Sequence, residues 1–206
     1  MKKTKNVEEL DTISIIMIGD SSVGKSTLMK KFITGIYSDS LNNTLGIELY
    51  KKEINLNEKT YLYKIWDTCG QERFRSLSKS YFQNANGIML LFNLNSLESF
   101  ENLNLWLNAI KECQKEDIPL IMVGTKCDLE YEVSKEQVEK FVKENIIIEK
   151  FFECSSKDDI GIKEPFMELA DLIIRLNIQK SKEFKNKKIK IIKKSSKDKK
   201  SKKKCC

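Results

Sequence analysis

The sequence predicts an α/β fold in which helices cover both faces of an open, mostly parallel sheet. Short, nearly unbroken apolar runs such as "GIMLLFN" (87–93) are typical of strands that are buried on both faces of a parallel sheet. Longer segments with apolar residues at helical spacing alternate with these runs along the chain. With 206 residues and 40% hydrophobic content, the chain is long enough to form one domain with a buried core.

The period of the apolar residues predicts the individual elements. Two further apolar runs, 13–19 and 119–125, are predicted strands. Residues 47–56 and 59–66 partly alternate apolar with polar residues around the turn-like "NE", which favours an antiparallel hairpin near one edge of the sheet. Helices are expected over residues 25–35, 98–115, 134–145 and 164–179.

The distribution of charge separates a body from a tail. Fourteen lysines and two acidic residues lie within 180–206, which leaves 23 basic and 28 acidic residues before position 180. We therefore expect an N-terminal extension over 1–11, a folded domain over 12–179 and a disordered polybasic tail over 180–206. The charged N-terminus lacks the apolar core of a signal peptide. Since no apolar run approaches the roughly 20 residues of a bilayer span, no membrane-spanning segment is expected.

Histidine and cysteine usage excludes several chemistries. The chain has no histidine, so it has no Ser-His-Asp relay, no imidazole general base and no histidine-ligated zinc. Any catalysis must then depend on positioning and electrostatics. The six cysteines (69, 113, 127, 154, 205 and 206) show no paired metal-ligand spacing, which indicates free, mostly buried thiols in a reducing compartment.

The stretch "GDSSVGKS" (19–26) fits the pattern GxxxxGK[ST] between a predicted strand and a predicted helix, the context of a phosphate-binding loop. In that interpretation backbone amides surround a phosphate, Lys25 places a charge at the β- and γ-phosphates, and the Ser26 hydroxyl ligates Mg²⁺. The alternative is an ordinary glycine-containing turn. The loop residues predicted to bind nucleotide are Ser21, Ser22, Val23, Gly24, Lys25, Ser26 and Thr27.

A second motif, "WDTCGQERF" (66–74), carries residue types suited to hydrolysis of a bound triphosphate. Asp67 at the end of a predicted strand can hold the same Mg²⁺ through water. The amide of Gly70 can approach a γ-phosphate, and Gln71 beside it can orient an attacking water. Each residue is ordinary alone, but after a phosphate-binding loop they predict the hydrolytic half of a GTPase site, with Gln71 as the catalytic residue.

A third motif, "TKCD" (125–128), predicts which base is bound. The Asp128 carboxylate can accept two hydrogen bonds from the ring NH and exocyclic amine of guanine, which adenine does not offer. The stem of Lys126 can pack along the base, and "ECSSKD" (153–158) offers backbone amides to the guanine O6. The remaining predicted contacts of the base are Thr125, Leu129, Ser155, Ser156 and Lys157.

The loop before the predicted hairpin, "YSDSLNNTLGIEL" (37–49), completes the predicted site. The ring of Tyr37 can lie against the base. The Thr44 hydroxyl can complete the Mg²⁺ ligands and sense the γ-phosphate. The predicted Mg²⁺ ligands are therefore Ser26, Thr44 and Asp67.

With these motifs in order, residues 12–178 resemble the Ras superfamily of small GTPases, and most closely its Rab branch. The Rab-like stretches are "GDSSVGKS", "TLGIEL", "KIWDTCGQERFRSL" and "SYFQNANGIML". The resemblance implies a P-loop NTPase small G domain, with six strands and five flanking helices. It also implies two switch segments, about 38–48 and 67–80, that GTP orders. A partner-binding surface at Leu49, Trp66 and Tyr81 is implied as well.

The chain departs from the Rab pattern at a few positions. Thr125 replaces the usual Asn, and the resemblance implies that a side-chain tie between base and phosphate loop is lost. Ser156 replaces Ala, Cys69 replaces Ala, and Leu49 replaces an aromatic residue of the partner surface. Rho-type relatives also have Thr at this position, but they carry an extra helix between the two base-binding motifs. The interval 125–155 in this chain has no room for that helix.

The last two residues, Cys205 and Cys206, follow a run of lysines. In Rab-like proteins such a pair receives two geranylgeranyl groups, which together with the lysines bind anionic cytoplasmic lipid stably. A nucleic-acid or nuclear-import partner would explain the lysines alone. As a coil, the tail would span about 29 Å. We expect a lipid-anchored protein on the cytoplasmic face of an internal membrane, with a cytosolic pool.

The predicted function is a GTP-binding and GTP-hydrolysing switch in vesicle traffic, with Mg²⁺ as cofactor and slow hydrolysis without an activating protein. Expected partners are an exchange factor, an activating protein, effectors and escort or dissociation-inhibitor proteins. We expect no nucleic-acid partner, and we expect the chain to be a monomer. The alternatives are a non-cycling GTP-binding scaffold, a Rho-like signalling GTPase and a small-metabolite P-loop kinase.

Overall fold

A computed structural model of the chain describes residues 11–38, 44, 46–68, 84–113 and 118–180. Its sheet has six strands in the order β2-β3-β1-β4-β5-β6, and every neighbouring pair is parallel except β2 with β3. The strands are β1 (Asp11–Ile18), β2 (Ile47–Leu56), β3 (Lys59–Thr68), β4 (Gly87–Asn93), β5 (Leu120–Thr125) and β6 (Ile148–Cys154). The predicted α/β class and six-stranded sheet are confirmed.

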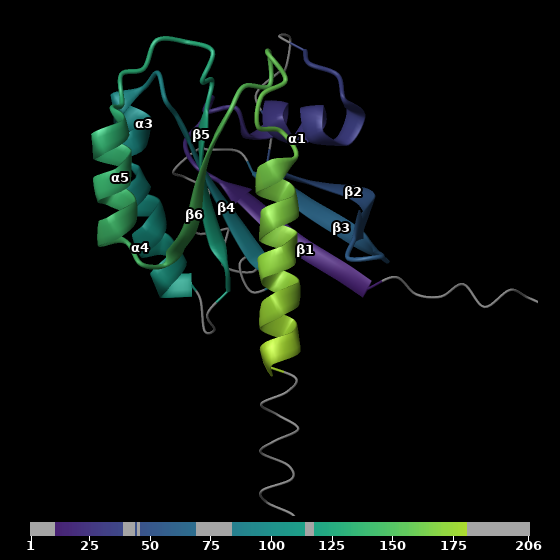
Figure 1. The fold of residues 1–206 in the computed structure, drawn as a ribbon. Helices are drawn as coiled ribbons and strands as arrows, with labels where there is room; N and C mark the ends of the chain where they lie inside the picture. The colour runs from purple at the N-terminus through teal and green to yellow at the C-terminus, as the bar shows by residue number, and fades with distance from the viewer. Residues whose placement is uncertain (1–10, 39–43, 45, 69–83, 114–117, 181–206) are drawn as a thin grey trace, which may run out of the picture.

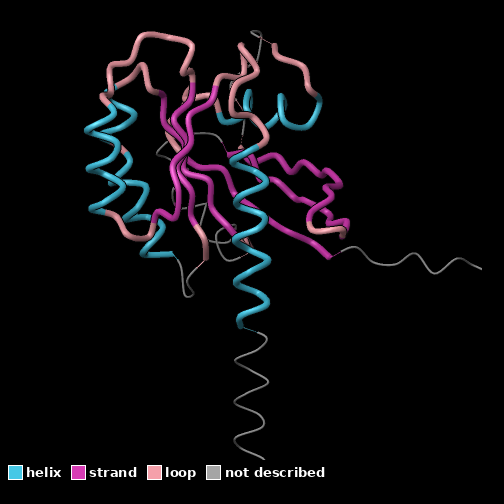
Figure 2. The backbone as a smooth tube through the Cα atoms, viewed as in Figure 1, coloured by secondary structure: helices cyan, strands magenta, loops and turns pink. Residues whose placement is uncertain are grey.

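Helices lie on both faces of this sheet, as Figures 1 and 2 show. The helices are α1 (Lys25–Thr34), α3 (Leu97–Glu101), α4 (Leu103–Cys113), α5 (Lys135–Glu144) and a helix over residues 164–180. On one face α1 and the helix 164–180 pack together, and the rings of Phe32 and Phe166 stack with centroids 4.0 Å apart. On the other face α3, α4 and α5 bury a second core cluster that includes Phe100, Leu107 and Phe141.

Local chemistry explains where several elements begin and turn. Ser134 caps α5 in a capping box, because its hydroxyl accepts from the Gln137 N–H while its own N–H donates to the Gln137 side chain. Asn57 and Glu58 both have positive φ, the geometry of a two-residue turn whose twist matches a hairpin. The hairpin predicted from "NE" is therefore confirmed.

The helix predicted over 98–115 is divided at Asn102. The backbone tightens there, since the Asn102 carbonyl accepts from Leu105 N at 3.0 Å as well as from Trp106 N at 3.3 Å. The Asn102 side chain donates to the Asp20 carboxylate at 2.7 Å, at the end of β1. The periodicity of apolar residues could not predict this break, because it depends on a polar contact with a distant segment.

Several predictions lie outside the described residues: the extension over 1–10, most of the two switch segments, and the tail beyond 180. The domain limits therefore stay a prediction. Among the residues that the structure describes, no helix is both long enough and apolar enough to cross a bilayer.

Candidate functional site

The predicted phosphate loop connects β1 to α1 at the carboxyl edge of the sheet, toward the top of Figure 1. Gly24 precedes α1 with φ 97°, so the phosphate loop ends at the N-terminus of a helix, where backbone N–H groups and the helix dipole favour an anion. Gly19 has φ 140°, and a Cβ there would lie 2.1 Å from the Leu91 carbonyl oxygen. The two glycines of the motif are thus required by backbone geometry and by close approach.

Lys25 lies across this loop and is only 5% exposed. Its ammonium donates to the Gly19 carbonyl at 2.9 Å and to the Asp20 carbonyl at 2.6 Å. A lysine is rarely this buried unless its charge has partners. The loop therefore holds a cation at its centre, which is the role predicted for Lys25 beside phosphates.

The three predicted Mg²⁺ ligands come from different segments and meet in the structure. The hydroxyl oxygens of Ser26 and Thr44 are 2.6 Å apart, and Thr44 donates to the Asp67 carboxylate at 3.4 Å. No group of three or more Cys, Asp or Glu that could hold a metal occurs in the part of the chain that the structure describes. This site would instead combine one carboxylate with hydroxyls, a donor set that suits Mg²⁺ when phosphate oxygens complete it.

Asp67 provides a direct test of whether a cation fits. Its side chain is fully buried, and the Oδ1 atom has no hydrogen-bond partner among the residues that the structure describes. Burial raises the pKa of this carboxyl group, while hydrogen bonds from Ser26 and Thr44 and the charge of Lys25 act in the opposite direction. A buried carboxylate oxygen without a donor is costly, and a metal ion or its bound water would supply the missing interaction. The residues present therefore fit Mg²⁺.

A cavity of about 290 Å³ opens beside the phosphate loop and brings the predicted base contacts together. Cys127 N–H donates to the Cys154 carbonyl at 3.1 Å, which joins the loop after β5 to the end of β6. Lys126 has φ 59°, in a turn that Leu129 N–H closes onto the Lys126 carbonyl at 3.1 Å. The cavity is lined by Gly24, Thr27, Tyr37, Thr125, Lys126, Asp128, Leu129, Ser156 and Lys157.

Thr125, which stands where the Rab pattern has Asn, bonds the phosphate loop through its hydroxyl. Its hydroxyl lies 2.5 Å from the Val23 carbonyl in the phosphate loop and 3.0 Å from the Phe92 carbonyl, and its single proton serves one of them at a time. The side chain is buried, as its residue is 3% exposed. A hydroxyl therefore joins the end of β5 to the phosphate loop, while the expected loss of the amide that ties the base to this loop stays a prediction.

The chain is similar to proteins of known family. A family model described as "Ras family" matches residues 14–175. The chain belongs to the Ras family. Ras-related protein Rab-10 from Diplobatis ommata is 37% identical over 163 residues, covering 78% of this chain and 80% of that protein. GTP-binding protein ypt2 from Schizosaccharomyces pombe is 36% identical over 185 residues, covering 89% of this chain and 90% of that protein.

A further relative is Ras-related protein Rab-8B from Bos taurus, 37% identical over 166 residues that cover 79% of each chain. These matches confirm the prediction of a Rab-type small GTPase. They do not favour the Rho-like alternative.

The sequence analysis missed one polar contact of this Ras-family site. The carboxylate of Asp20, second residue of the phosphate loop, accepts from Asn102 Nδ2 and Trp106 Nε1, each at 2.7 Å. These bonds pair its carboxylate with two side-chain donors and attach the loop to the start of α4. The only sequence signal was an acidic residue within a loop predicted to bind an anion.

Other predicted residues have different outcomes. Leu49 on β2 and Trp66 on β3 are cross-strand neighbours, and Leu49 is exposed; that they form a partner-binding surface stays a prediction. Ser155 is buried behind the cavity and does not line it. Predictions at Gly70, Gln71, Tyr81, Cys205 and Cys206 lie outside the described residues.

Proposed function

We propose that this Rab-type protein binds and hydrolyses GTP at one continuous site along the carboxyl edge of the sheet. The observation that carries the proposal is the cavity in which Gly24 and Thr27, from the phosphate loop and α1, face Asp128 and Tyr37. A phosphate-binding loop therefore opens directly into a pocket with a carboxylate that can read guanine. A kinase that shared only the phosphate loop would have no use for that carboxylate.

In this proposal each segment has one task. Amides of residues 21–27 and the Lys25 ammonium bind the phosphates, and Tyr37 and Lys126 lie against the base. Amides of Ser156 and Lys157 face the guanine O6, while Thr125 and Leu129 support the pocket wall. Gly70 approaches the γ-phosphate and Gln71 orients the attacking water.

We propose Mg²⁺ as the cofactor, held by Ser26, Thr44 and Asp67. When bound, the ion neutralises charge that develops on the phosphate oxygens during hydrolysis. The unpartnered Asp67 oxygen supports this assignment. Ser26 lies in the first turn of α1 and Thr44 belongs to the first predicted switch segment, so the two hydroxyls join a fixed element to one that would respond to nucleotide.

Hydrolysis is expected to be slow without a partner. The sequence has no arginine in the phosphate loop or in residues 36–46 that could stabilise the transition state in cis. An arginine supplied in trans by an activating protein accelerates hydrolysis by about 10³ to 10⁵ in related switches. We therefore include an activating protein among the partners, together with an exchange factor and effectors that contact Leu49, Trp66 and Tyr81.

Membrane traffic is the proposed setting. Prenyl groups on Cys205 and Cys206, assisted by the lysine-rich tail, would hold the protein on the cytoplasmic face of an internal membrane. Escort and dissociation-inhibitor proteins would then maintain a cytosolic pool, because they would shield the two apolar prenyl chains from water. The support for this part of the proposal is the sequence of the tail and the Rab-type family.

Calorimetry with GTP and ATP in Mg²⁺ buffer tests the central assignment. Asp128→Asn removes the charge and one acceptor, so GTP affinity should fall roughly 100-fold while ATP binding stays weak. Xanthosine triphosphate carries a carbonyl in place of the guanine amine, so the variant amide can donate to it. That nucleotide should then bind the variant better than GTP does.

Asp158→Asn removes the same charge two residues beyond Ser156 and serves as the control, with GTP affinity expected to stay at the wild-type value. Equal affinity of the wild-type protein for GTP and ATP would overturn the proposed function.

A further inference from the structure

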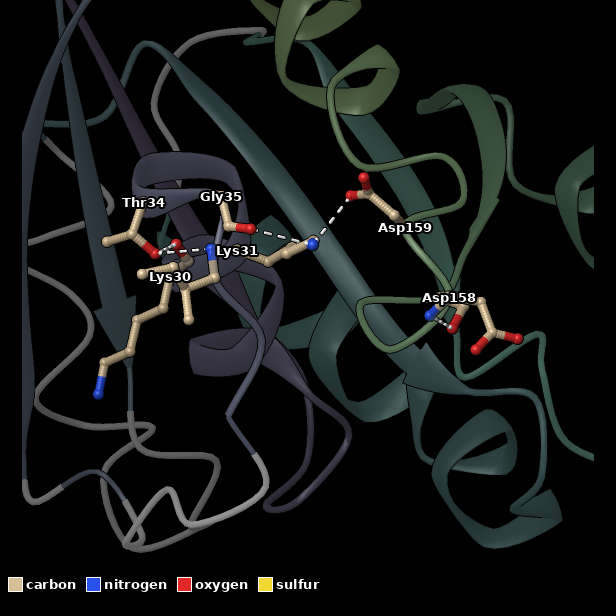
Figure 3. Close-up of polar contacts among 8 residues, drawn as sticks. Lys30, Lys31, Thr34, Gly35, Asp158 and Asp159 are labelled. Carbon is tan, nitrogen blue, oxygen red and sulfur yellow. Dashed lines mark hydrogen bonds and ion pairs between the residues drawn. The ribbon is translucent and has the colours of Figure 1, made fainter.

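An ion pair connects the end of α1 to the loop that follows β6. The Lys31 ammonium lies 3.2 Å from Asp159 Oδ1 and also donates to the Gly35 carbonyl at 3.1 Å (Figure 3). The Gly35 N–H donates in turn to the Lys31 carbonyl at 2.9 Å, with φ 75° at Gly35. Lys31 therefore closes the turn that ends the helix and joins this turn to a segment 128 positions later in the sequence.

The two segments joined in this way lead to two parts of the wall of the base cavity. Tyr37 lines the cavity two residues after Gly35. Ser156 and Lys157 line it shortly before Asp159. The ion pair lies outside the cavity lining, so it can set the separation of the walls without touching the nucleotide.

The loop that carries Asp159 has a fixed shape, so a force on Asp159 is transmitted to Ser156 and Lys157. Ser155 and Ile160 exchange two backbone hydrogen bonds of 2.9 and 3.0 Å across the base of the loop. Gly161 has φ 61°, and a Cβ there would lie 2.2 Å from the Glu153 carbonyl oxygen. These contacts hold the loop as one unit.

We propose that Lys31 and Asp159 form a clasp that holds the two walls of the base pocket together and slows the release of guanine nucleotide. The proposal rests on the proposed function, because it assigns the rate at which that same site loses its ligand. Both are positioning residues. They act through the Tyr37 segment and through the amides of Ser156 and Lys157.

The exposure of the pair sets the size of the expected effect. The Lys31 side chain is 11% exposed and that of Asp159 is 71% exposed, so water and salt reach the carboxylate. Measured couplings of exposed ion pairs correspond to about two- to five-fold in an equilibrium or rate. The clasp should weaken as salt rises, because exposed charges are screened.

The chain offers isosteric variants and a matched control. Asp159 has φ 62°, a conformation that Asn also tolerates, so Asp159→Asn removes the charge without straining the backbone. Lys31→Met keeps the apolar stem of the side chain. Asp158→Asn removes the same charge one residue earlier, where the side chain points away from Lys31 (Figure 3) and forms no ion pair with any described residue.

The measurement is the release of GDP labelled with a fluorescent N-methylanthraniloyl group, chased with excess unlabelled GDP in Mg²⁺ buffer, on the full chain. At low salt, Asp159→Asn and Lys31→Met should each speed release about two- to five-fold, and the double variant no more than either alone. At high salt the rates of all variants should converge. Single-turnover GTP hydrolysis should not change with Asp159→Asn, because the substitution lies outside the phosphate and Mg²⁺ sites.

Three results would overturn the clasp: equal release rates for wild type and Asp159→Asn at low salt, an equal acceleration by Asp158→Asn, or additive effects of the two clasp substitutions. Failure of the wild-type protein to retain labelled GDP at all would overturn the proposed function instead.

Discussion

At the end of β3, Asp67 keeps a fully buried carboxylate with one oxygen that lacks a hydrogen-bond partner. Removing a charged group from water is unfavourable unless another charge compensates, and burial accordingly raises the pKa of this group. The same feature makes the site ready for a divalent cation. Folding stability and ligand binding therefore make opposite demands on this one residue.

Asp67→Asn should separate the two demands. In nucleotide-free protein without Mg²⁺, the free energy of unfolding should stay the same or rise, because a buried charge is removed. With Mg²⁺ and GDP, the variant should lose most of the stabilisation that Mg²⁺ adds to the wild-type complex. Thermal unfolding with and without Mg²⁺ measures both effects. A variant that Mg²⁺ stabilises as strongly as it does the wild type would contradict the assignment of Asp67.

Cys154 at the end of β6 should make stability depend on pH in alkaline solution. Burial, with smaller contributions from Cys127 and Asp128, raises the pKa of its thiol from 9.0 to about 12. Above pH 9 the unfolded chain loses this proton while the folded chain keeps it. The stabilising contribution is therefore complete below pH 9 and is lost as pH rises toward 12, at up to about 1.4 kcal/mol per pH unit.

Urea unfolding between pH 8 and 10.5 checks this expectation against Cys154→Ala. The variant should be less stable at every pH, since it leaves a small cavity, but its stability should fall less steeply with pH. Parallel curves for the two proteins would show that the buried thiol does not titrate differently on unfolding.

At the scale of elements, the site depends on side-chain hydrogen bonds that join one element to another. Thr125 fastens β5 to the phosphate loop and Asp20 fastens that loop to α4. Lys52 on β2 donates to the Phe32 carbonyl at 2.5 Å, at the end of α1. The first two contacts hold the phosphate loop directly, and the third holds the far end of the helix that follows it.

Thr125→Val tests the hydrogen bond from the Thr125 hydroxyl to the phosphate loop, because valine has nearly the same shape and lacks the hydroxyl. The buried Val23 carbonyl would lose this donor, so the GDP-bound protein should lose about 1–3 kcal/mol of unfolding free energy and release GDP faster. Thr60→Val is the matched control, since the Thr60 hydroxyl bonds Asn55 at 2.8 Å on the exposed hairpin. Equal losses in the two variants would mean that the tie to the phosphate loop contributes nothing specific.

Most elements could be predicted from local sequence pattern, although β6 and the break between α3 and α4 were not, and the hydrogen bonds that join the elements could not be predicted. Buried strands such as 87–93 and the hairpin turn at Asn57 follow from local pattern, so their limits agree with the structure to within two residues. The sequence motifs predicted that one site contains Ser26, Thr44 and Asp67. The Asp20–Trp106 bond and the Lys31–Asp159 pair join residues 86 and 128 positions apart, and no local pattern reports such contacts.

At the scale of the whole molecule, the helix 164–180 separates the nucleotide site from the point where the described chain ends. Figure 1 shows this helix running from the edge that holds the nucleotide site to the opposite edge, where the described chain ends. The residues beyond it carry the lysines and end in Cys205 and Cys206. A membrane anchor there would leave the nucleotide site and the surface around Leu49 and Trp66 directed away from the lipid.

Lipid attachment can be tested on full-length protein prenylated in a eukaryotic lysate and mixed with vesicles that contain phosphatidylserine. Two prenyl chains bind stably and one only marginally, so Cys205→Ser or Cys206→Ser should weaken flotation and the double variant should abolish it.

Exchange of six tail lysines for glutamine should weaken binding to anionic vesicles while leaving binding to neutral vesicles unchanged, because the lysines act through surface charge. GDP retention should be unaffected by any of these changes, since the tail leaves the fold at the edge opposite the nucleotide. Flotation of the double cysteine variant at the wild-type level would show that the lysines alone attach the protein, and the anchor would then be electrostatic.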